Sequence, residues 1–308
     1  IHLSSFNRLK TTMTDTLSSV QRRQYLLAAG TALLLPSGAL LAATTPASAH
    51  AQLAALEQQA GGRLGVSAWR TAGGARIAHR ADERFPMCST FKAMLAAAVL
   101  ARSVTEQGLL QKTIRYTAKD LVTYSPLTEK HLADGMTVAA LCAATLQHSD
   151  NSAANFLMKI LGGPRAVTAF ARSIGNQVFQ LERWETKLNS AIPGETRDTT
   201  SPASMTHSLQ QLLLGNSLPA PQRQQLETWM RGNLTGGQRI RAGVPAGWSV
   251  ADKTGSGAYG TVNDIGVAWP VSGAPLVIAV YYTREQADAP TNQDIITAAT
   301  RIVVSALT

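Results

Sequence analysis

The sequence predicts an α/β fold of the α+β type: one antiparallel sheet built from both ends of the chain and flanked by helices, with an all-helical region inserted between them. Strand-like alternation of polar and apolar residues occurs near residues 64–79 and again over 249–282. Helical spacing of apolar residues dominates the intervening segment. Because a sheet must bury its apolar faces against other elements, the two parts should meet along a cleft, where we expect the active site.

The first 49 residues predict export rather than a folded element. Arg22-Arg23 precede an apolar run that reaches Ala43, and Ala47-Ser48-Ala49 match the small-residue pattern of a signal-peptidase site. The run is short for a membrane span and is broken by glycine and proline. The paired arginines resemble a twin-arginine signal, and Met13 is a candidate for the true start. We therefore expect a periplasmic or secreted protein with no membrane segment after cleavage near Ala49.

Each remaining element follows from its own pattern. A short helix is expected at residues 51–59, followed by two strands at 64–70 and 76–79 around a glycine turn. The other expected helices are at residues 92–102, 138–148, 151–161, 166–174, 202–214, 221–230 and 294–307. The other expected strands are at residues 249–253, 261–269 and 276–282.

Residues 179–201 form a polar stretch without periodicity, and a loop of this length indicates function rather than simple connection. The order of the elements divides the chain into an α/β domain and a helical domain. We assign residues 50–87 and 232–308 to the α/β domain. Residues 88–231, including the loop at 179–201, are assigned to the helical domain.

Composition narrows the classes of function. The 308 residues are 45% hydrophobic and 15% charged, as in a globular domain. The formal net charge is +9, but no run of four Lys or Arg residues occurs, so we expect no nucleic-acid partner. Cys88 and Cys142 lie in apolar surroundings that favour buried free thiols, although an exported protein can form a disulfide. The scattered histidines have no zinc-ligand spacing. We expect no metal, no cofactor and a monomer.

The first chemical motif is Ser89-Thr90-Phe91-Lys92. Phe85-Pro86 indicates an extended approach and an alanine-rich helix follows, which predicts that Ser89 lies in the first helical turn. The i, i+3 spacing then places the Lys92 ammonium beside the Ser89 hydroxyl. A serine needs such a base to become a nucleophile. However, about one Ser-x-x-Lys is expected by chance in a chain of this length, and a helix-capping serine beside a solvated lysine would explain the motif equally well.

Two further motifs favour the catalytic interpretation of Ser89 and Lys92. Ser149-Asp150-Asn151 lies between two helical stretches and by itself indicates a helix N-cap. Lys253-Thr254-Gly255 follows a strand-like segment and by itself indicates a strand end. Each string is expected in only about one chain in twenty. The ordered set of three motifs is the signature of class A β-lactamases and penicillin-binding proteins. Over about residues 50–308 the chain resembles class A β-lactamases, particularly cefotaximase-type and related chromosomal enzymes.

The resemblance implies a role for each motif residue. Ser89 would be the nucleophile that opens the lactam ring, with Lys92 or Glu185 as the acylation base. Ser149 would pass a proton to the lactam nitrogen, and Lys253 would support Ser149 and attract the substrate carboxylate. The backbone N–H groups of Ser89 and Ser256 would form an oxyanion hole. The substrate, a small β-lactam, would be bound by Tyr124, Asn151, Asn189, Arg239, Thr254, Gly255 and Ser256.

The feature that distinguishes a hydrolase is Glu185 with Asn189 in the polar loop. Their spacing of four would let one helical turn direct both side chains at a single water, which Glu185 would activate against the ester on Ser89. A single glutamate in a polar loop is normally solvated, but its position matches the family. Arg183 and Asp198 would clamp the loop by an ion pair. The alternatives are a DD-peptidase of the penicillin-binding type and a penicillin-sensing receptor domain, which would both lack this deacylating water.

Two departures from the family bear on substrate choice. Many family members carry an arginine a few residues after the Lys-Thr-Gly motif, but residues 259–263 contain none here. Arg239 resembles the substitute that some relatives use to bind the substrate carboxylate; alternatively it is a surface arginine. Gly257 stands where carbapenem-hydrolysing members often place a cysteine that pairs with Cys88, so we expect weak carbapenem hydrolysis. The small residues Ser256, Gly257 and Ala258 predict room for bulky cephalosporin side chains.

Overall fold

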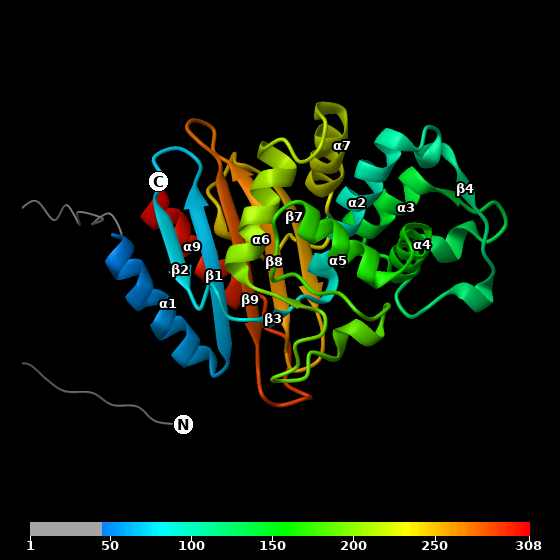
Figure 1. Cartoon of the computed structure of the whole chain (residues 1–308). Helices are drawn as coiled ribbons and strands as arrows, with labels where there is room; N and C mark the ends of the chain where they lie inside the picture. Colours follow the sequence, from blue (N-terminus) through cyan, green and yellow to red (C-terminus); the bar gives the residue numbers. More distant parts are fainter. Residues whose placement is uncertain (1–44) are drawn as a thin grey trace, which may run out of the picture. The chain divides into compact units, whose positions relative to one another are not determined.

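The computed structural model describes residues 45–308 (Figure 1). The predicted twin-arginine signal and the apolar run of the signal peptide lie outside these residues. Helix α1 (Pro46–Ala60) begins before the expected residue 51, so it includes the small residues of the cleavage motif. Thr45 caps this helix by accepting a hydrogen bond from the Ser48 N–H, and Gly61, with φ 67°, ends it. None of the helices in the described residues is long and apolar enough to cross a membrane.

The central sheet has five antiparallel strands in the order β2-β1-β9-β8-β7. The N-terminal strand β1 pairs directly with the C-terminal strand β9, for example Val66 opposite Val280. The predicted sheet built from both ends of the chain is therefore confirmed. The strands are β1 (Arg63–Arg70), β2 (Arg76–His79), β7 (Ser249–Ser256), β8 (Val262–Trp269) and β9 (Leu276–Thr283).

Strand β9 shows why both faces of the sheet need helices, since all eight of its residues are buried. Its alternate residues belong to two different apolar clusters. Ile278 and Val280 pack with α1 and α9 (Asp294–Leu307), while Ala279 and Tyr281 pack on the side that carries α6 (Pro202–Leu209). Figure 1 shows α6 in front of the sheet and α1 and α9 on the other side.

The inserted helices share one apolar cluster with the inner face of the sheet. They are α2 (Phe91–Thr105), α3 (Val138–Gln147), α4 (Asn151–Leu161), α5 (Pro164–Ser173) and α7 (Ala220–Arg231). Helix α2 runs through the middle of this cluster, and its first ten residues are all buried. The continuous core fixes the start of α2 relative to strands β7 and β8.

Two parts of the middle segment differ from the prediction of mainly helical structure. Residues 106–137 contain only short 3-10 turns and the two-residue strands β4 (Thr113–Ile114) and β5 (Met136–Thr137). The expected helix at 202–214 ends at Leu209 and continues as a π-helical turn to Leu214. The polar loop is anchored by two more short strands, since β3 (Phe85–Pro86) pairs with β6 (Thr199–Thr200).

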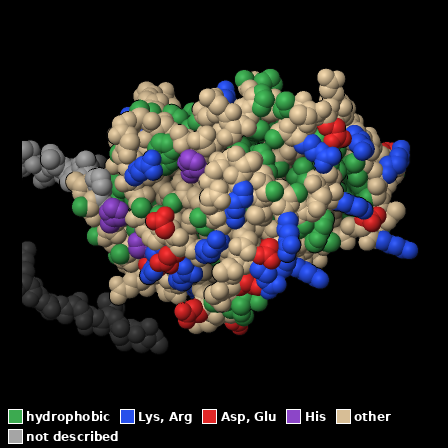
Figure 2. All heavy atoms as spheres, viewed as in Figure 1, with side chains coloured by type: hydrophobic (Ala, Val, Ile, Leu, Met, Phe, Trp, Pro, Cys, Tyr) green, Lys and Arg blue, Asp and Glu red, His purple; other side chains and the backbone are tan. Residues whose placement is uncertain are grey.

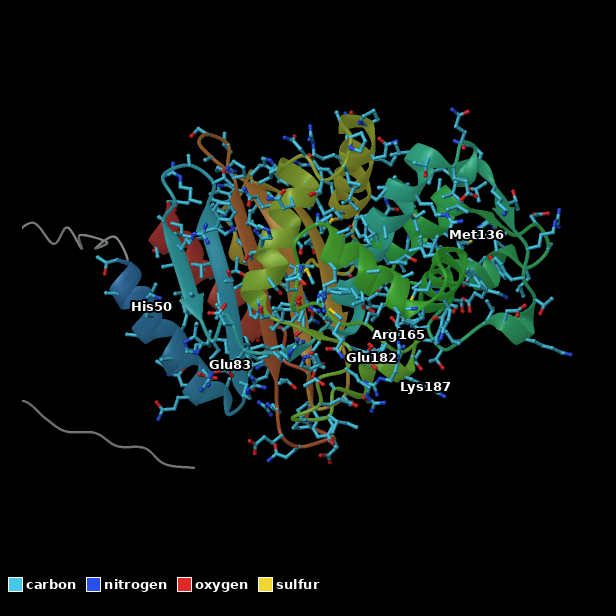
Figure 3. The ribbon with its side chains drawn as sticks, viewed as in Figure 1. His50, Glu83, Met136, Arg165, Glu182 and Lys187 are labelled. Carbon is cyan, nitrogen blue, oxygen red and sulfur yellow. The ribbon has the colours of Figure 1, made fainter. Side chains whose placement is uncertain are left out.

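The surface in Figure 2 carries Lys and Arg side chains interspersed with Asp and Glu, without a single-sign patch over the visible face. Figure 3 shows where the polar loop lies: Glu182 and Lys187 follow α5 in the chain, and Glu182 lies near Arg165 at the start of that helix. The loop therefore spans from the helical region back to the strand that precedes Ser89.

Candidate active site

Ser89 lies in a tight turn between β3 and α2. The turn is a 3-10 helix (Cys88–Thr90), and α2 begins directly after it at Phe91. The prediction that Ser89 lies in the first turn of the α-helix is therefore wrong, because Ser89 lies in the 3-10 turn that precedes it. The cause is Cys88, whose φ of 44° is left-handed and reverses the extended chain that leaves β3. The Ser89 side chain lies close to the surface of a cavity, and the residue is 8% exposed.

Strand β7 passes unusually close to this turn. A Cβ atom at Gly255 would lie 2.7 Å from the carbonyl oxygen of Met87 and 3.2 Å from the Ser89 nitrogen. Side chains essentially never approach a backbone oxygen so closely, and only glycine allows this contact. The glycine of the Lys-Thr-Gly motif therefore brings the edge of β7 against the Ser89 turn.

Lys92 is fully buried below Ser89 and contacts three of the predicted site residues. Its Nζ lies 2.6 Å from Asn151 Oδ1, 2.8 Å from the Ser149 carbonyl oxygen and 3.0 Å from Glu185 Oε1. The Ser89 hydroxyl donates to Glu185 Oε1 at 3.4 Å rather than to Lys92. Burial lowers the pKa of Lys92, and the Glu185 carboxylate partly opposes that shift. The interpretation of Lys92 as a solvated lysine is wrong.

Ser149 is held at the junction of α3 and α4 with φ 58°. Its hydroxyl lies 3.1 Å from Lys253 Nζ and 3.4 Å from Lys92 Nζ. Burial, together with the positive charges of Lys92 and Arg239, lowers the pKa of Lys253 well below its ordinary value. The capping interpretation of this motif also holds, because Asp150 caps α4 by accepting the Ala153 N–H at 2.9 Å. The cap fixes the backbone that presents Ser149.

Glu185 is buried and its two oxygens face different partners. Oε1 faces Ser89 and Lys92, while Oε2 accepts a 2.6 Å hydrogen bond from Asn189 Nδ2. The expected helical turn is a 3-10 turn (Lys187–Ser190) that contains Asn189, and Glu185 precedes it through a cis Glu185–Thr186 peptide. The convergence of Glu185 and Asn189 is nevertheless as predicted, and a solvated Glu185 is excluded.

Asn155 in α4 is a positioning residue that sequence reasoning missed. Its amide bonds both backbone groups of Glu185: Oδ1 accepts the N–H and Nδ2 donates to the carbonyl, both at 3.0 Å. The available signal was an asparagine four residues after Asn151, on the same face of the helix.

The predicted clamp of the loop is confirmed. Arg183 Nε lies 2.5 Å from Asp198 Oδ2, and the backbone N–H groups of Glu182 and Arg183 donate to Asp198 Oδ1 at 2.7 and 3.0 Å. Glu195 pairs with the same arginine at 3.1 Å. The carbonyl of Asp198 accepts the Met87 N–H at 2.9 Å. The clamp thus connects the loop directly to the chain just before Ser89.

A cavity of about 350 Å³ opens at this point. Its lining includes Ser89, Ser149 and all seven predicted substrate-binding residues: Tyr124, Asn151, Asn189, Arg239, Thr254, Gly255 and Ser256. Lys92, Glu185 and Lys253 lie in the wall behind it, each at most 4% exposed. Thr235 also lines the cavity and was not predicted. Its hydroxyl contacts the Thr254 hydroxyl, and its neighbours in the sequence form no motif that indicates a binding residue.

Arg239 is almost fully buried at the edge of this cavity, so the surface-arginine interpretation is wrong. Its Nη1 donates to the carbonyls of Gly255 and Asn263 at 2.8 and 2.7 Å, and its Nη2 donates to Ser256 Oγ at 2.8 Å. The Nε donates to Gln293 Oε1 at 3.0 Å. Burial lowers the pKa of Arg239.

Both cysteines are buried free thiols, as the sequence predicted, and burial raises the pKa of each. Gly257 lies directly against Cys88, since a Cβ atom on it would be 2.6 Å from Cys88 Sγ. The same Cβ would be 2.7 Å from the Asn189 carbonyl oxygen. Gly257 therefore allows the loop that carries Asn189 to contact the strand edge.

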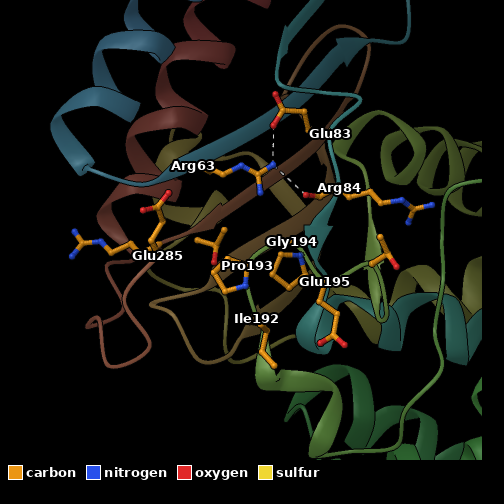
Figure 4. A pocket seen from close by; sticks show the side chains of 13 residues that line it. Arg63, Glu83, Arg84, Ile192, Pro193, Gly194, Glu195 and Glu285 are labelled. Atoms are coloured by element: carbon orange, nitrogen blue, oxygen red, sulfur yellow. Dashed lines mark hydrogen bonds and ion pairs between the residues drawn. The ribbon is translucent and has the colours of Figure 1, made fainter.

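A second cavity of about 470 Å³ lies between residues 191–196 and the ends of β1 and β9 (Figure 4). Arg63 crosses it and donates to Glu83 at 2.8 Å, with Pro193 and Ile192 on the facing loop. Its lining residues include neither a serine nor a lysine, so it lacks the nucleophile and the ammonium groups that converge at Ser89. Although this cavity is larger, the chemistry identifies the Ser89 cavity as the active site.

The fold and this constellation define a serine acyl-transfer enzyme, and comparisons with known proteins identify its family. Residues 48–307 match the model of the Beta-lactamase enzyme family. The chain is 56% identical to the carbapenem-hydrolyzing beta-lactamase KPC of Klebsiella oxytoca, over 82% of this chain and 87% of that protein. It is 51% identical to beta-lactamase CTX-M-4 of Salmonella typhimurium, over 92% of this chain and 97% of that protein.

A solved structure gives the same result. The crystal structure of a beta-lactamase from Desulfarculus baarsii superposes with a TM-score of 0.83 at 56% sequence identity, covering 84% of this chain and 96% of that one. The chain belongs to the β-lactamase family and is a class A serine β-lactamase. The resemblance inferred from the three motifs is confirmed.

Proposed function

We propose that this β-lactamase opens the lactam ring by forming an ester on Ser89 and then hydrolyses that ester with a water activated by Glu185. The observation that carries the proposal is the position of the Glu185 carboxyl group. One oxygen faces both the Ser89 hydroxyl and Lys92, and the other is held by Asn189. A buried carboxylate shared by a nucleophile and an amide is suited to take a proton from water.

In acylation, the proton of Ser89 passes to Glu185 or to Lys92. Both remain candidates, because Glu185 Oε1 is within 3.4 Å of the Ser89 hydroxyl and 3.0 Å of Lys92 Nζ. The depressed pKa of Lys92 favours its neutral, basic form. Ser149, between the two lysines, then supplies a proton to the leaving nitrogen.

Substrate binding is assigned to the lining of the cavity. The backbone N–H groups of Ser89 and Ser256 would stabilise the developing oxyanion, and the close approach of β7 at Gly255 supports this role. Thr254, Lys253 and Arg239 form the side suited to a carboxylate. Asn151 and Tyr124 line the cavity on the side of the helical region and would contact the acyl side chain.

Glu185 also separates the hydrolase from the alternatives. A DD-peptidase of the penicillin-binding type or a penicillin sensor would stop at the ester, since neither needs a carboxylate and an amide directed at a water. Here Asn155 and the Arg183–Asp198 clamp hold both groups in place. This supports complete turnover rather than capture of the drug.

For substrate range we infer penicillins and cephalosporins, with weak carbapenem hydrolysis. The small residues at Ser256 and Gly257 leave the strand edge free of side-chain bulk beside Cys88, and no cysteine stands opposite that thiol. The 56% identical relative is named as carbapenem-hydrolyzing, so this inference distinguishes the present chain from that relative.

We expect export, with cleavage near Ala49, and a monomer in solution; class A β-lactamases are typically periplasmic. We also propose that residues 50–87 and 232–308 form an α/β domain and that residues 88–231 form a helical domain.

The experiment that tests the proposed reaction is the replacement Ser89→Ala. Hydrolysis of nitrocefin and of benzylpenicillin should fall to the uncatalysed background, because no other hydroxyl lies against both Glu185 and the Gly255 strand edge in the described residues. Thermal unfolding is measured in parallel and should change little. A residual rate near that of the unmodified enzyme would remove Ser89 from the mechanism.

A further inference from the structure

Two buried acids lie beneath the segment that carries Arg239. Asp264 in β8 is fully buried, and its Oδ2 accepts the Ile240 N–H at 3.0 Å. Its Oδ1 has no hydrogen-bond partner among the described residues. Asp252 in β7 is also fully buried, but it has two side-chain partners: Arg241 Nε at 2.7 Å and Asn233 Nδ2 at 2.6 Å. Only Asp264 is directed at the backbone next to Arg239.

The register of the sheet explains this placement. Asp264 pairs with Thr254, and Asp252 is two residues away from Thr254 along β7. Because side chains alternate along a strand, Asp252, Thr254 and Asp264 share one face. The start of α8 (Ile240–Gly243) lies over that face, with its three consecutive residues Arg239, Ile240 and Arg241 tied to the sheet by hydrogen bonds.

The Arg239 guanidinium depends on this anchor for its orientation. Its planar fork reaches Gly255, Ser256 and Asn263 at once, which requires its own backbone to be fixed. Helix α8 is only four residues long and has no side-chain cap, so the helix itself provides little support. The Asp264 contact to Ile240 supplies a fixed point one residue after Arg239.

We propose that Asp264 is a positioning residue that holds Arg239 in the geometry needed to bind the substrate carboxylate. The proposal rests on the role of Arg239 given under the proposed function. The hydrogen bond from the Ile240 N–H performs this task, and burial together with the neighbouring Asp252 raises the pKa of Asp264 well above its usual range, which disfavours a negative charge there. An uncharged acceptor of the same shape should therefore replace it.

The test compares a substrate with and without its carboxylate. In Asp264→Ala, the ratio of kcat/KM for benzylpenicillin to kcat/KM for benzylpenicillin methyl ester should fall about tenfold, the effect expected for loss of one buried hydrogen bond. The loss should appear mainly in KM, with kcat changed less than about twofold. Asp264→Asn keeps the acceptor for the Ile240 N–H, and its ratio should return to within about twofold of the unmodified enzyme.

A matched control separates positioning from stability. Glu57 is another buried carboxylate that accepts a backbone N–H, from Leu64 at 3.0 Å, but it lies on α1 near the opposite edge of the sheet. Glu57→Ala should lower the melting temperature comparably and leave the substrate ratio unchanged. If Asp264→Ala leaves the ratio unchanged, or if Asp264→Asn fails to restore it, the proposal is overturned.

A double-mutant cycle distinguishes failure of this proposal from failure of the role assigned to Arg239. Arg239→Ala alone should lower the same ratio, and adding Asp264→Ala should lower it by less than about twofold more, because both changes remove the same interaction. Independent, multiplying effects would overturn the positioning role. An unchanged ratio in Arg239→Ala would instead refute the binding role of Arg239, on which the inference rests.

Discussion

Replacing Gly255 with alanine introduces one methyl group at the closest approach between β7 and the Ser89 turn. The new Cβ would lie 2.7 Å from the Met87 oxygen and 3.2 Å from the Ser89 nitrogen. An ordinary contact needs about 3.4 Å or more, so strand or turn must move by roughly 0.7 Å. Overpacking of this kind costs about 1–3 kcal/mol, and at about 2–4 °C per kcal/mol the melting temperature should fall by roughly 2–12 °C.

The effect of Gly255→Ala on catalysis should be larger than its effect on stability. The shift displaces the Ser256 N–H relative to Ser89 and moves the carbonyl that holds Arg239. A misplacement approaching 1 Å can reduce a rate by about 100-fold, so kcat/KM for nitrocefin should fall by about that factor well below the melting transition. Gly237→Ala is the control, because a Cβ there meets nothing within 4 Å. A kcat/KM within twofold of the unmodified enzyme in Gly255→Ala would show that the close approach of β7 to the Ser89 turn is not needed for catalysis.

Three further predictions concern pH, the loop clamp and substrate range. Because burial lowers the pKa of Lys253, the unfolded chain binds more protons than the folded chain between that lowered pKa and about 10.5. The contribution of Lys253 to stability therefore rises with pH in this window. In denaturant titrations, the free energy of unfolding of the unmodified enzyme minus that of Lys253→Met should increase from pH 7 to pH 10. A difference that does not change with pH would contradict the lowered pKa. Arg183→Ser leaves the buried Asp198 with only backbone donors and should lower the free energy of unfolding by about 2–3 kcal/mol. The melting temperature should fall, and proteolysis between residues 182 and 198 should become faster. An unchanged melting temperature would show that the clamp is not needed. Cefotaxime turnover should be comparable to that of benzylpenicillin and imipenem turnover much slower, and negligible cefotaxime hydrolysis would reject the argument from the small strand edge.

Elements with strong terminal signals could be predicted from the sequence almost to the residue. Helix α4 begins and ends as expected because Asp150 caps it and Gly162, with φ 103°, ends it. The amphipathic C-terminal helix also has its predicted bounds, Asp294–Leu307. Strands β7 and β9 extend beyond their expected ends, since pairing within the sheet extends a strand beyond its local alternation, while β8 begins one residue later than expected.

Other features depend on contacts that local sequence does not encode. Residues 106–137 fold as short turns and two-residue strands, which are too short to show a helical or strand periodicity in the sequence. The 3-10 turn at Ser89 depends on the left-handed Cys88 and on the adjacent strand β7.

In the site, the motifs located the chemistry, but not the residues that position it. Thr235 enters the cavity only because β7 brings Thr254 against it, and Asn155 acts on Glu185 from another element. The register of β7 and β8 places Asp264 against the backbone of Ile240, the residue after Arg239. Such residues carry no motif of their own, because their role arises from tertiary pairing.

The mass of Glu185→Ala during reaction with benzylpenicillin tests the role of this carboxylate in hydrolysis of the ester. We predict that the variant still opens the ring and accumulates a long-lived species with the mass of the protein plus one intact penicillin, because the water that should release the ester has lost its base. The same variant with Ser89→Ala should show no adduct. Sustained turnover by Glu185→Ala without any accumulating adduct would show that this carboxylate is not needed to hydrolyse the ester.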